Sequence, residues 1–160
     1  MKKSLVLNTI ILLSISSIII SLDFFSKIWV INNYELFEIK SINSMLNIFR
    51  IHNYGLAFSM FSNISKEHKY FLSLINTITI IILFKIISFT LYDHICYNFP
   101  YILIISGAIG NLINRLYFGF VIDFIDIHFK HWHIATFNIA DISIFLGCIS
   151  LLYINFSKKK

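Results

Sequence analysis

The stretch FPYILIISGAIGNLINRLY, residues 99–117, is apolar over most of its length and turns polar toward its C-terminal end. A transmembrane helix needs about 20 consecutive, mainly apolar residues, so this stretch is long enough to cross a bilayer. Three further runs of this kind occupy residues 5–22, 70–91 and 139–156. The sequence therefore predicts a mainly α-helical, polytopic membrane protein with four transmembrane helices, forming one integral membrane domain over residues 1–160.

Composition and charge agree with a membrane protein. The chain is 58% hydrophobic and only 13% charged, which is low for a soluble domain. The formal net charge of +5 could indicate a nucleic-acid partner. However, Lys2 and Lys3 open the chain and residues 158–160 (KKK) close it, and basic residues next to spans are typical of the cytoplasmic side. We therefore expect cytoplasmic termini and no nucleic-acid partner.

The N-terminal apolar run follows a basic start, as the apolar run of a secretory signal peptide does. It is longer than the apolar part of most signal peptides, and no Ala-x-Ala-like cleavage site follows it. We expect an uncleaved first span, with a cleaved signal peptide as the alternative.

The two outer connections differ in length and composition. The first, residues 25–69, contains LNIFRIHN, a run of β-type composition, followed by the turn-like NYG, and predicts a small extracytoplasmic β-rich lobe. Nearby residues 56–61, LAFSMF, are apolar enough to lie along the membrane interface. The second, residues 118–137, carries three histidines in IHFKHWHI, whose spacing matches no common zinc pattern. We expect an interfacial loop there and no metal site at His128, His131 and His133.

The polar end of the third span has a helical pattern. Offsets of three, four, seven and eight residues place one set of side chains on a single helix face: Gly107, Gly110, Asn111, Asn114 and Arg115. A packing seam of small residues joined by polar groups explains the glycines. It explains Arg115 poorly, because an arginine inside a membrane helix needs a partner. Asn111 and Arg115 are therefore candidate site residues, while Asn114 stays undecided between the two interpretations.

Polar residues also mark the outer ends of the other spans. Asp23 and Lys27 are four residues apart and can pair on a helix, which by itself indicates an interfacial salt bridge. Asn53 precedes Tyr-Gly, an ordinary turn sequence. Asn138, with Asp141 three residues later, fits a helix N-cap followed by a capping box.

Four spans bring these polar residues to one side of the membrane. Asp123 follows the third span, so it should lie at the same depth as Asp141 at the start of the fourth. Two neighbouring carboxylates do not both ionise readily, and one acid and one base around a water is the arrangement of aspartic proteases. A small transporter or channel is the alternative, but it predicts polar groups spread through the membrane depth. A non-catalytic scaffold, with Asp141 only a cap, is a further alternative.

Five motifs, in order, resemble the bacterial lipoprotein signal peptidase family, also called signal peptidase II, over nearly the whole chain. DFFSK resembles the family's Asp-x-x-Ser/Thr-Lys, HNYGLAFS its Asn-x-Gly-x-Ala-Phe, and GAIGNLINR its Gly-x-x-Gly-Asn-x-x-Asp-Arg. VIDFID and FNIAD resemble the two segments that carry the family's catalytic aspartates. The five motifs together are specific, whereas each alone is weak.

The resemblance implies an aspartic endopeptidase, a hydrolase of the bacterial inner membrane. Such an enzyme cleaves prolipoproteins just before a cysteine that carries diacylglycerol. The resemblance implies that Asp123 and Asp141 are the catalytic pair and that the nearby Asp126 is not part of it. It further implies a set of substrate-binding or site-supporting residues: Asp23, Lys27, Asn53, Asn111, Arg115 and Asn138. We expect a monomer in contact with membrane lipid, with no cofactor and with the active site near the outer face.

Three positions depart from the family pattern. Asn114 stands where the family usually has an aspartate, Ser106 where a glycine is frequent, and Phe24 where a glutamine is common. None of them is one of the two candidate catalytic aspartates. We therefore expect activity to be kept and the contacts around the pair to be altered.

Overall fold

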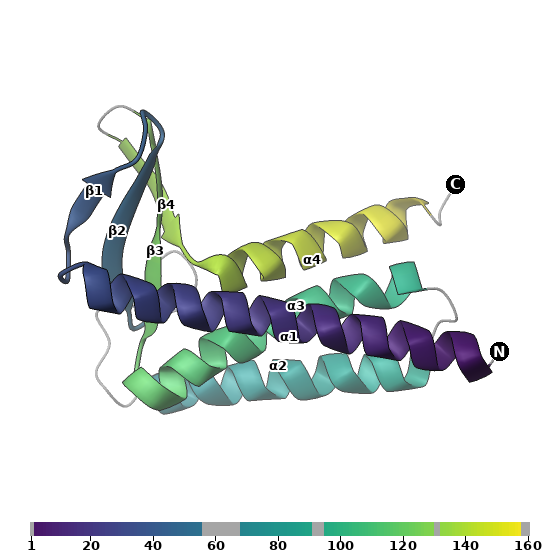
Figure 1. Cartoon of the computed structure of the whole chain (residues 1–160). Helices are drawn as coiled ribbons and strands as arrows, with labels where there is room; N and C mark the ends of the chain where they lie inside the picture. Colours follow the sequence, from purple (N-terminus) through teal and green to yellow (C-terminus); the bar gives the residue numbers. More distant parts are fainter. Residues whose placement is uncertain (1, 56–67, 91–94, 130–131, 158–160) are drawn as a thin grey trace.

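The computed structural model describes residues 2–55, 68–90, 95–129 and 132–157. Within them lie four long helices: α1 (Lys2–Asn33), α2 (His68–Thr90), α3 (Ile95–Phe118) and α4 (Ile139–Ser157). All four are long and apolar enough to cross a membrane, which confirms the four predicted spans. The helices run along one another, and a small sheet stands at one end of the bundle (Figure 1). The first helix begins and the last one ends at the opposite end.

The first helix continues well beyond the predicted end of its span at Leu22. It runs to Asn33, so the outer lobe begins after this residue and not at residue 25. The prediction was wrong because Asp23 and Lys27 do not end the helix but pair within it. Arg50 closes the helix by donating from Nη1 to the carbonyl oxygens of Ile31 (3.2 Å) and Tyr34 (2.6 Å).

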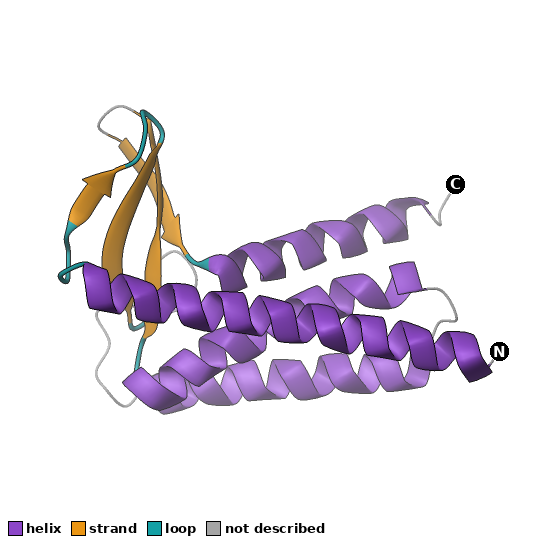
Figure 2. Cartoon of the chain, viewed as in Figure 1, coloured by secondary structure: helices purple, strands orange, loops and turns teal. Residues whose placement is uncertain are grey.

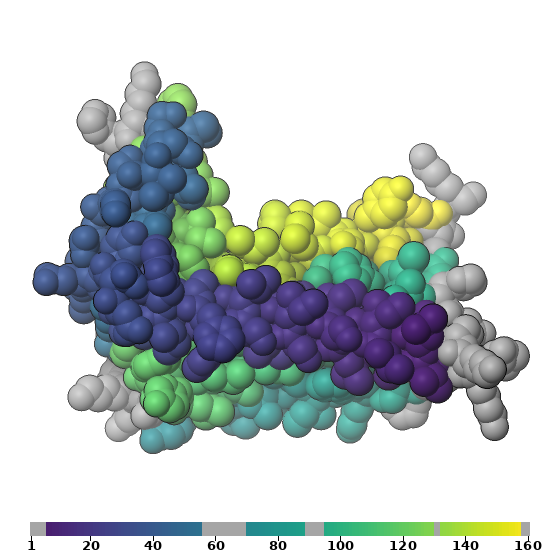
Figure 3. Space-filling model, in the orientation of Figure 1, coloured from purple at the N-terminus to yellow at the C-terminus, as the bar shows by residue number. Residues whose placement is uncertain are grey.

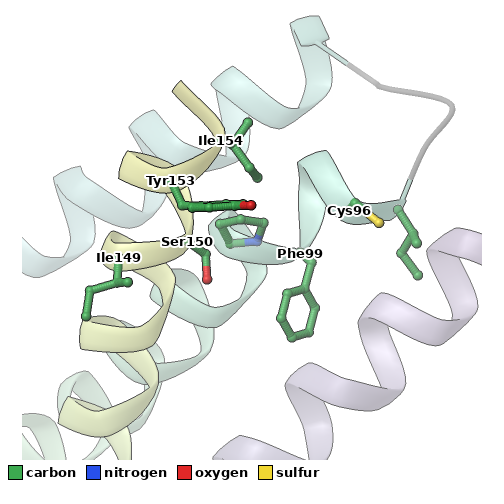
Figure 4. Close-up of a pocket in the computed structure, with 8 residues that line it drawn as sticks. Cys96, Phe99, Ile149, Ser150, Tyr153 and Ile154 are labelled. Carbon is green, nitrogen blue, oxygen red and sulfur yellow. The ribbon is translucent and has the colours of Figure 1, made fainter. Parts of the chain in front are cut away.

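The third helix begins at Ile95, four residues before the predicted start at Phe99. Pro100 therefore lies inside the helix, in its second turn, where it removes the hydrogen bond that its backbone nitrogen would otherwise donate to the carbonyl oxygen of Cys96. Near this start, α3 and α4 leave a mainly apolar cavity of about 520 Å³ between them. Cys96 and Phe99 of α3 and Ser150 and Tyr153 of α4 line it (Figure 4).

The sheet is antiparallel and four-stranded, in the order β1 (Ile39–Ser41), β2 (Leu46–Asn53), β3 (Val121–Phe129) and β4 (Trp132–Phe137). The strands form a separate layer across one end of the helices, opposite the end where the chain begins and ends (Figure 2).

The predicted β-rich lobe exists, but half of its strands come from the second outer connection. The prediction of a loop for IHFKHWHI was wrong, because His128 and His133 face each other in the β3–β4 ladder. Polar and apolar residues do alternate from Ile125 to Phe129, which is a strand signal. His131 and residues 56–61, the expected interfacial segment, lie outside the described residues.

The central helix of the bundle is α3, most of which is buried, whereas α1, α2 and α4 are largely exposed on the outside. Its glycines allow close approach, as predicted. A Cβ at Gly107 would collide with the carbonyl oxygen of Ala140, and one at Gly110 would lie 2.8 Å from Oδ2 of Asp23. The seam thus joins α3 to α4 and to α1, at the end of the bundle that carries the sheet.

Candidate active site

The first turn of α4 is closed by the predicted capping box. Oδ1 of Asn138 accepts a hydrogen bond from the backbone nitrogen of Asp141 (2.9 Å). In return, Oδ2 of Asp141 accepts one from the backbone nitrogen of Asn138 (3.3 Å). The box holds the carboxylate of Asp141 against the helix start and leaves its Oδ1 atom to accept from another residue.

Strand β3 brings a second carboxylate to the same place. Asp123 is 2% exposed. Its Oδ1 accepts from Nδ2 of Asn138 (2.7 Å), and its Oδ2 accepts from Nδ2 of Asn53 (2.9 Å). Asn138 therefore donates to both aspartates, from its side chain to Asp123 and from its backbone to Asp141. Two residues predicted to converge from distant parts of the chain thus meet around one asparagine.

The surroundings of Asp123 favour its protonated form. Burial raises the pKa of the Asp123 carboxyl to about 7, and the nearby charge of Asp141 acts in the same direction. Hydrogen bonds from Asn53 and Asn138 and the charge of Lys27 favour the ionised form and oppose this rise. A carboxyl group with a pKa near neutrality can both accept and release a proton under physiological conditions.

The predicted pair of Asp23 and Lys27 forms inside the protein and not at its surface. The Lys27 ammonium lies 2.8 Å from Oδ2 of Asp23, and the two side chains are 0% and 1% exposed. Oδ1 of Asp23 accepts from the backbone nitrogen of Ala140 (2.9 Å). The ion pair of α1 is thereby connected to the first turn of α4, next to Asp141.

Asn111 of α3 links this ion pair to both candidate catalytic aspartates. Its Oδ1 accepts from Lys27 (3.1 Å) and from Nδ2 of Asn138 (3.3 Å). Its Nδ2 donates to Oδ1 of Asp141 (2.8 Å). With these three bonds made, the amide has one favourable orientation, and it holds the Asp141 carboxylate from the side of α3.

A small cavity of about 140 Å³ lies beside Asp141, between α2, α3 and α4. Its polar lining includes two residues already described, Asn53 and Asn111, together with Arg115. The guanidinium of Arg115 donates to the carbonyl oxygen of Gly55 (3.1 Å). The cavity thus presents amide and guanidinium donors next to a carboxylate.

One lining residue of this cavity was missed in the sequence. Asn76 lies in α2, where its Nδ2 donates to the carbonyl oxygen of Ala108 in α3 (2.9 Å). The signal was available, because an asparagine in the middle of an apolar span is expensive unless it is paired.

Asn114, undecided in the sequence, connects α3 to β3. Its Oδ1 accepts from the backbone nitrogen of Ile122 (3.3 Å), next to Asp123. It is 1% exposed, and among the described residues its Nδ2 has no hydrogen-bond partner. The contact made by Asn114 holds the start of the strand in place and does not involve either carboxylate directly.

Asp126 lies on the other face of the sheet from Asp123, because successive side chains of a strand alternate. It is fully buried, and it accepts from Nδ2 of Asn47 (2.9 Å) and Oγ1 of Thr136 (3.2 Å). Nδ1 of His133 lies 2.9 Å from its Oδ2. Across the described ranges, no three His, Cys, Asp or Glu side chains are grouped to hold a metal ion.

Several known proteins are similar to this chain in sequence and in fold. The family model for signal peptidase (SPase) II matches residues 15–157. The lipoprotein signal peptidase of Buchnera aphidicola subsp. Baizongia pistaciae is 51% identical, over 97% of this chain and 96% of that protein. That of Wigglesworthia glossinidia brevipalpis is 42% identical, over 82% of this chain and 85% of that protein. That of Haemophilus ducreyi is 38% identical, over 91% of each.

Solved structures of bacterial membrane enzymes have a similar fold, at lower sequence identity. A bacterial membrane enzyme superposes with a TM-score of 0.84 at 25% identity, over 93% of this chain and 89% of that one. A second bacterial membrane enzyme superposes with a TM-score of 0.78 at 26% identity, over 89% and 90%. The family model and the close relatives together cover almost all of the chain, and on this basis it belongs to the signal peptidase II family.

Proposed function

We propose that this chain is an aspartic endopeptidase that removes signal peptides from prolipoproteins, and that Asp123 and Asp141 are its catalytic pair. The observation that carries the proposal is the pair of hydrogen bonds from Asn138, one to each carboxylate. Family membership supports a peptidase and prolipoprotein substrates. The cut falls just before a cysteine that carries diacylglycerol.

The chemistry requires one ionised and one protonated carboxyl group. The ionised member takes a proton from a water, whose oxygen attacks the scissile carbonyl carbon. The protonated member gives its proton to the carbonyl oxygen, forming a tetrahedral gem-diol. The carbon–nitrogen bond then breaks: the aspartate that took the proton of the water gives it to the leaving nitrogen, and the other aspartate takes a proton from a gem-diol hydroxyl, which restores the starting pair. The products are a signal peptide with a free carboxylate and a lipoprotein with a free cysteine amine. The two aspartates act as one coupled unit that holds a single proton.

The neighbouring side chains keep the pair in place and receive the substrate. Asn53 and Asn138 hold Asp123, and Asn111 holds Asp141. Lys27 holds Asn111 in turn. Arg115 and the amides of the small cavity beside Asp141 bind the substrate backbone near the scissile bond.

The fold supports a defined place in the membrane. Four helices long enough to span a bilayer, together with the family, fit a multi-pass protein of the bacterial inner membrane. The basic ends of the chain lie on the cytoplasmic side, and the sheet and the aspartates lie near the outer face. The residues around both aspartates come from one chain, so the proposed site needs no partner subunit, and we propose a monomer in contact with lipid.

A small transporter or channel is not supported. The candidate site residues are gathered at one end of the bundle and do not form a path through it. The relatives of the chain are peptidases.

The proposal is tested by incubating the purified protein with a diacylglyceryl-modified prolipoprotein and detecting the shortened product. Asp123→Asn and Asp141→Asn should each lower kcat by about 10⁴-fold, as in other hydrolases that lose one member of a catalytic unit. Asp126→Asn is the matched control, because this carboxylate is equally buried but faces away from the pair. Cleavage at the wild-type rate by either Asp123→Asn or Asp141→Asn would exclude the pair.

A further inference from the structure

Two cavities border Asp141 and differ in their lining. The first is the small cavity between α2, α3 and α4, which we call the mixed cavity. Its lining combines hydrogen-bonding side chains with apolar ones: Asn53, Asn76, Asn111 and Arg115, and Leu72, Ile75, Val121 and Ile144. The second measures about 300 Å³ and lies where the sheet meets α4. We call it the apolar corner. Apart from Asp141, its lining is entirely apolar: Ile127, Ala135, Phe137, Ile142 and Phe145.

The register of the sheet continues this apolar character along one face. Directly paired residues share a face, and side chains alternate along each strand. Two rows on the face toward α4 are apolar throughout: Leu46, Ile127 and Ala135, and then Ile48, Ile125 and Phe137. The row on the opposite face is polar: Asn47, Asp126 and Thr136. Asp123 lies on the apolar face, two residues before Ile125, so the catalytic pair is at the end of these rows.

Within the part of the chain that the structure describes, side chains along this apolar surface are exposed. Trp132 is 78% exposed and Phe145 is 64% exposed. Trp132 pairs with Phe129, which lies two residues after Ile127 and so extends the same face. Figure 3 shows the hollow between the sheet and α4, open on one side. Because α4 is a membrane span, this hollow opens toward the acyl chains of the bilayer.

We propose that the apolar corner binds the acyl chains of the diacylglyceryl group on the substrate cysteine. This assignment rests on the proposed function. The bond to be cut precedes the lipid-bearing cysteine, so the thioether must lie within one residue of the catalytic pair. The acyl chains can then lie in either of the two cavities that border Asp141. The mixed cavity suits the peptide backbone, because the amide and guanidinium groups in its lining can donate to carbonyl oxygens.

The apolar corner suits acyl chains for the opposite reason. An extended peptide there would leave its amide groups without partners, which is costly away from water. A signal-peptide helix is also a poor occupant, because a helix with its side chains is about 10 Å across and the corner holds only about 300 Å³. Acyl chains need no hydrogen bonds and can enter sideways from the bilayer.

Photo-crosslinking tests the position of the chains directly. A prolipoprotein whose diacylglyceryl chains carry diazirine groups is bound to Asp123→Asn, so that the substrate stays intact, and is irradiated. Labels are expected on Ile142 and Phe145 of α4 and on Ala135 and Phe137 of β4. Labels confined to Leu72 and Ile75 in the mixed cavity, or spread evenly over all lipid-facing surfaces, would overturn the assignment.

A filling substitution tests the same assignment through kinetics. Ala135→Phe places a ring in the corner, and two substrates are compared, one with dihexadecanoyl and one with dibutanoyl chains. The variant should lower kcat/KM about tenfold for the long-chain substrate and less than about twofold for the short-chain one. Ser150→Phe fills the other apolar cavity, at the far end of α4, and should affect neither substrate.

The outcomes separate this inference from the proposed function. If wild-type protein cleaves neither substrate, the proposed function fails. If wild-type protein cleaves both and Ala135→Phe slows both equally, the proposed function stands and the acyl-chain site is wrong, with the signal-peptide helix then the better occupant.

Discussion

At the scale of single residues, Asn138 has two uses that a local sequence pattern could not separate. It caps α4 through its side-chain oxygen, and it donates from its side-chain nitrogen to Asp123. The cap explains why an asparagine stands before the fourth span. The second bond exists only because β3 begins beside the cap.

Substituting Asn138 separates the two uses. Serine can accept the capping hydrogen bond but has no amide to donate to Asp123. We expect Asn138→Ser to keep a higher thermal midpoint than Asn138→Ala, because serine retains the cap, although both variants lose the buried bonds from the asparagine amide. We expect kcat to fall at least tenfold, roughly the value of one hydrogen bond to a charged group. Asn138→Ala should lose about 1 kcal/mol of stability as well. Wild-type kcat in Asn138→Ser would show that the bond to Asp123 has no catalytic value.

The hydrogen bond from Asn53 should set the alkaline limit of activity. The pair needs one proton, and activity is lost when that proton leaves as the pH rises. The pKa of Asp123 is about 7, and the Asn53 bond holds it lower than burial alone would. Asn53→Ala should therefore raise this pKa and move the alkaline limb of kcat/KM to higher pH, by about one unit. Asn47→Ala removes the equivalent bond to Asp126 and should leave the limb in place. A limb that moves to lower pH, or stays, would contradict this interpretation.

The raised pKa of Asp123 should also make folding stability depend on pH. The folded carboxyl titrates near 7 and the unfolded one near its model value of 3.8. Between these values the folded state binds more protons, so stability falls as the pH rises from about 4 to 7. Asp123→Asn removes this loss. Its thermal midpoint in detergent should exceed that of wild type by at least about 3 °C at pH 8, with a smaller difference at pH 4. If the thermal midpoint of Asp123→Asn exceeded that of wild type by more at pH 4 than at pH 8, the predicted direction of the pH dependence would be wrong.

At the scale of elements, the contact between α3 and α4 sets the position of Asp141. The two helices approach closely at Gly107, whose added Cβ would collide with the carbonyl oxygen of Ala140. They approach again at Gly147, whose added Cβ would lie 2.7 Å from the carbonyl oxygen of Pro100. The first contact is beside the candidate site, and the second is near the start of α3, toward the end of the bundle away from the sheet.

Alanine at the two glycines should therefore affect stability alike and activity differently. Overpacking of this kind costs about 1–3 kcal/mol, so Gly107→Ala and Gly147→Ala should both lower the thermal midpoint. Only Gly107→Ala pushes on the residue next to Asp141, and we expect it to lower kcat/KM more than about tenfold, against less than about threefold for Gly147→Ala. Equal activity in two folded variants would mean that the helix spacing at Gly107 does not position the carboxylate.

Strands β2 and β3 differ in how well the sequence predicted them. The β2 segment was evident from its β-type composition, and the lobe was predicted from it. An interfacial loop was predicted for IHFKHWHI, although residues 125–129 alternate between apolar and polar side chains. The first four residues of β3, 121–124, are all buried and show no such alternation. A strand covered on both faces has no period-two pattern, and its identity depends on pairing with a distant strand.

At the scale of the whole molecule, one buried ion pair connects three helices. Lys27 binds Asp23 on its own helix and Asn111 on α3, and Asp23 accepts from the backbone of Ala140 on α4. The sequence predicted the pair from its spacing. Its burial follows only from the assembly of the helices around it.

The energetics of this pair can be measured by a double-mutant cycle. Lys27→Met leaves the Asp23 carboxylate buried without its partner and should cost about 3–5 kcal/mol. Lys27→Met combined with Asp23→Leu removes both charges, and we expect it to be more stable than Lys27→Met alone. The double variant should still lose activity, because Asn111 and Ala140 lose the groups that they bind. If the double variant were less stable than Lys27→Met, the Asp23 carboxylate would stabilise the fold through contacts other than its pairing with Lys27.

The sequence by itself determined the features that depend on neighbouring residues. Four apolar runs predicted four spans, a capping box predicted the start of α4, and ordered motifs predicted the family. These signals are local in the chain, because bilayer thickness, helix periodicity and capping each act over one helix or less.

The tertiary structure alone decided which distant groups meet. Strand register places Asp123 on the face toward α4 and Asp126 on the opposite face, and a slip of one residue would exchange them. Packing at Gly107 and Gly110 brings the ion pair of α1 within reach of Asn111. The same register gathers the apolar rows beside Asp141. Register and packing depend on contacts between segments far apart in the chain, and for this reason no local pattern could specify them.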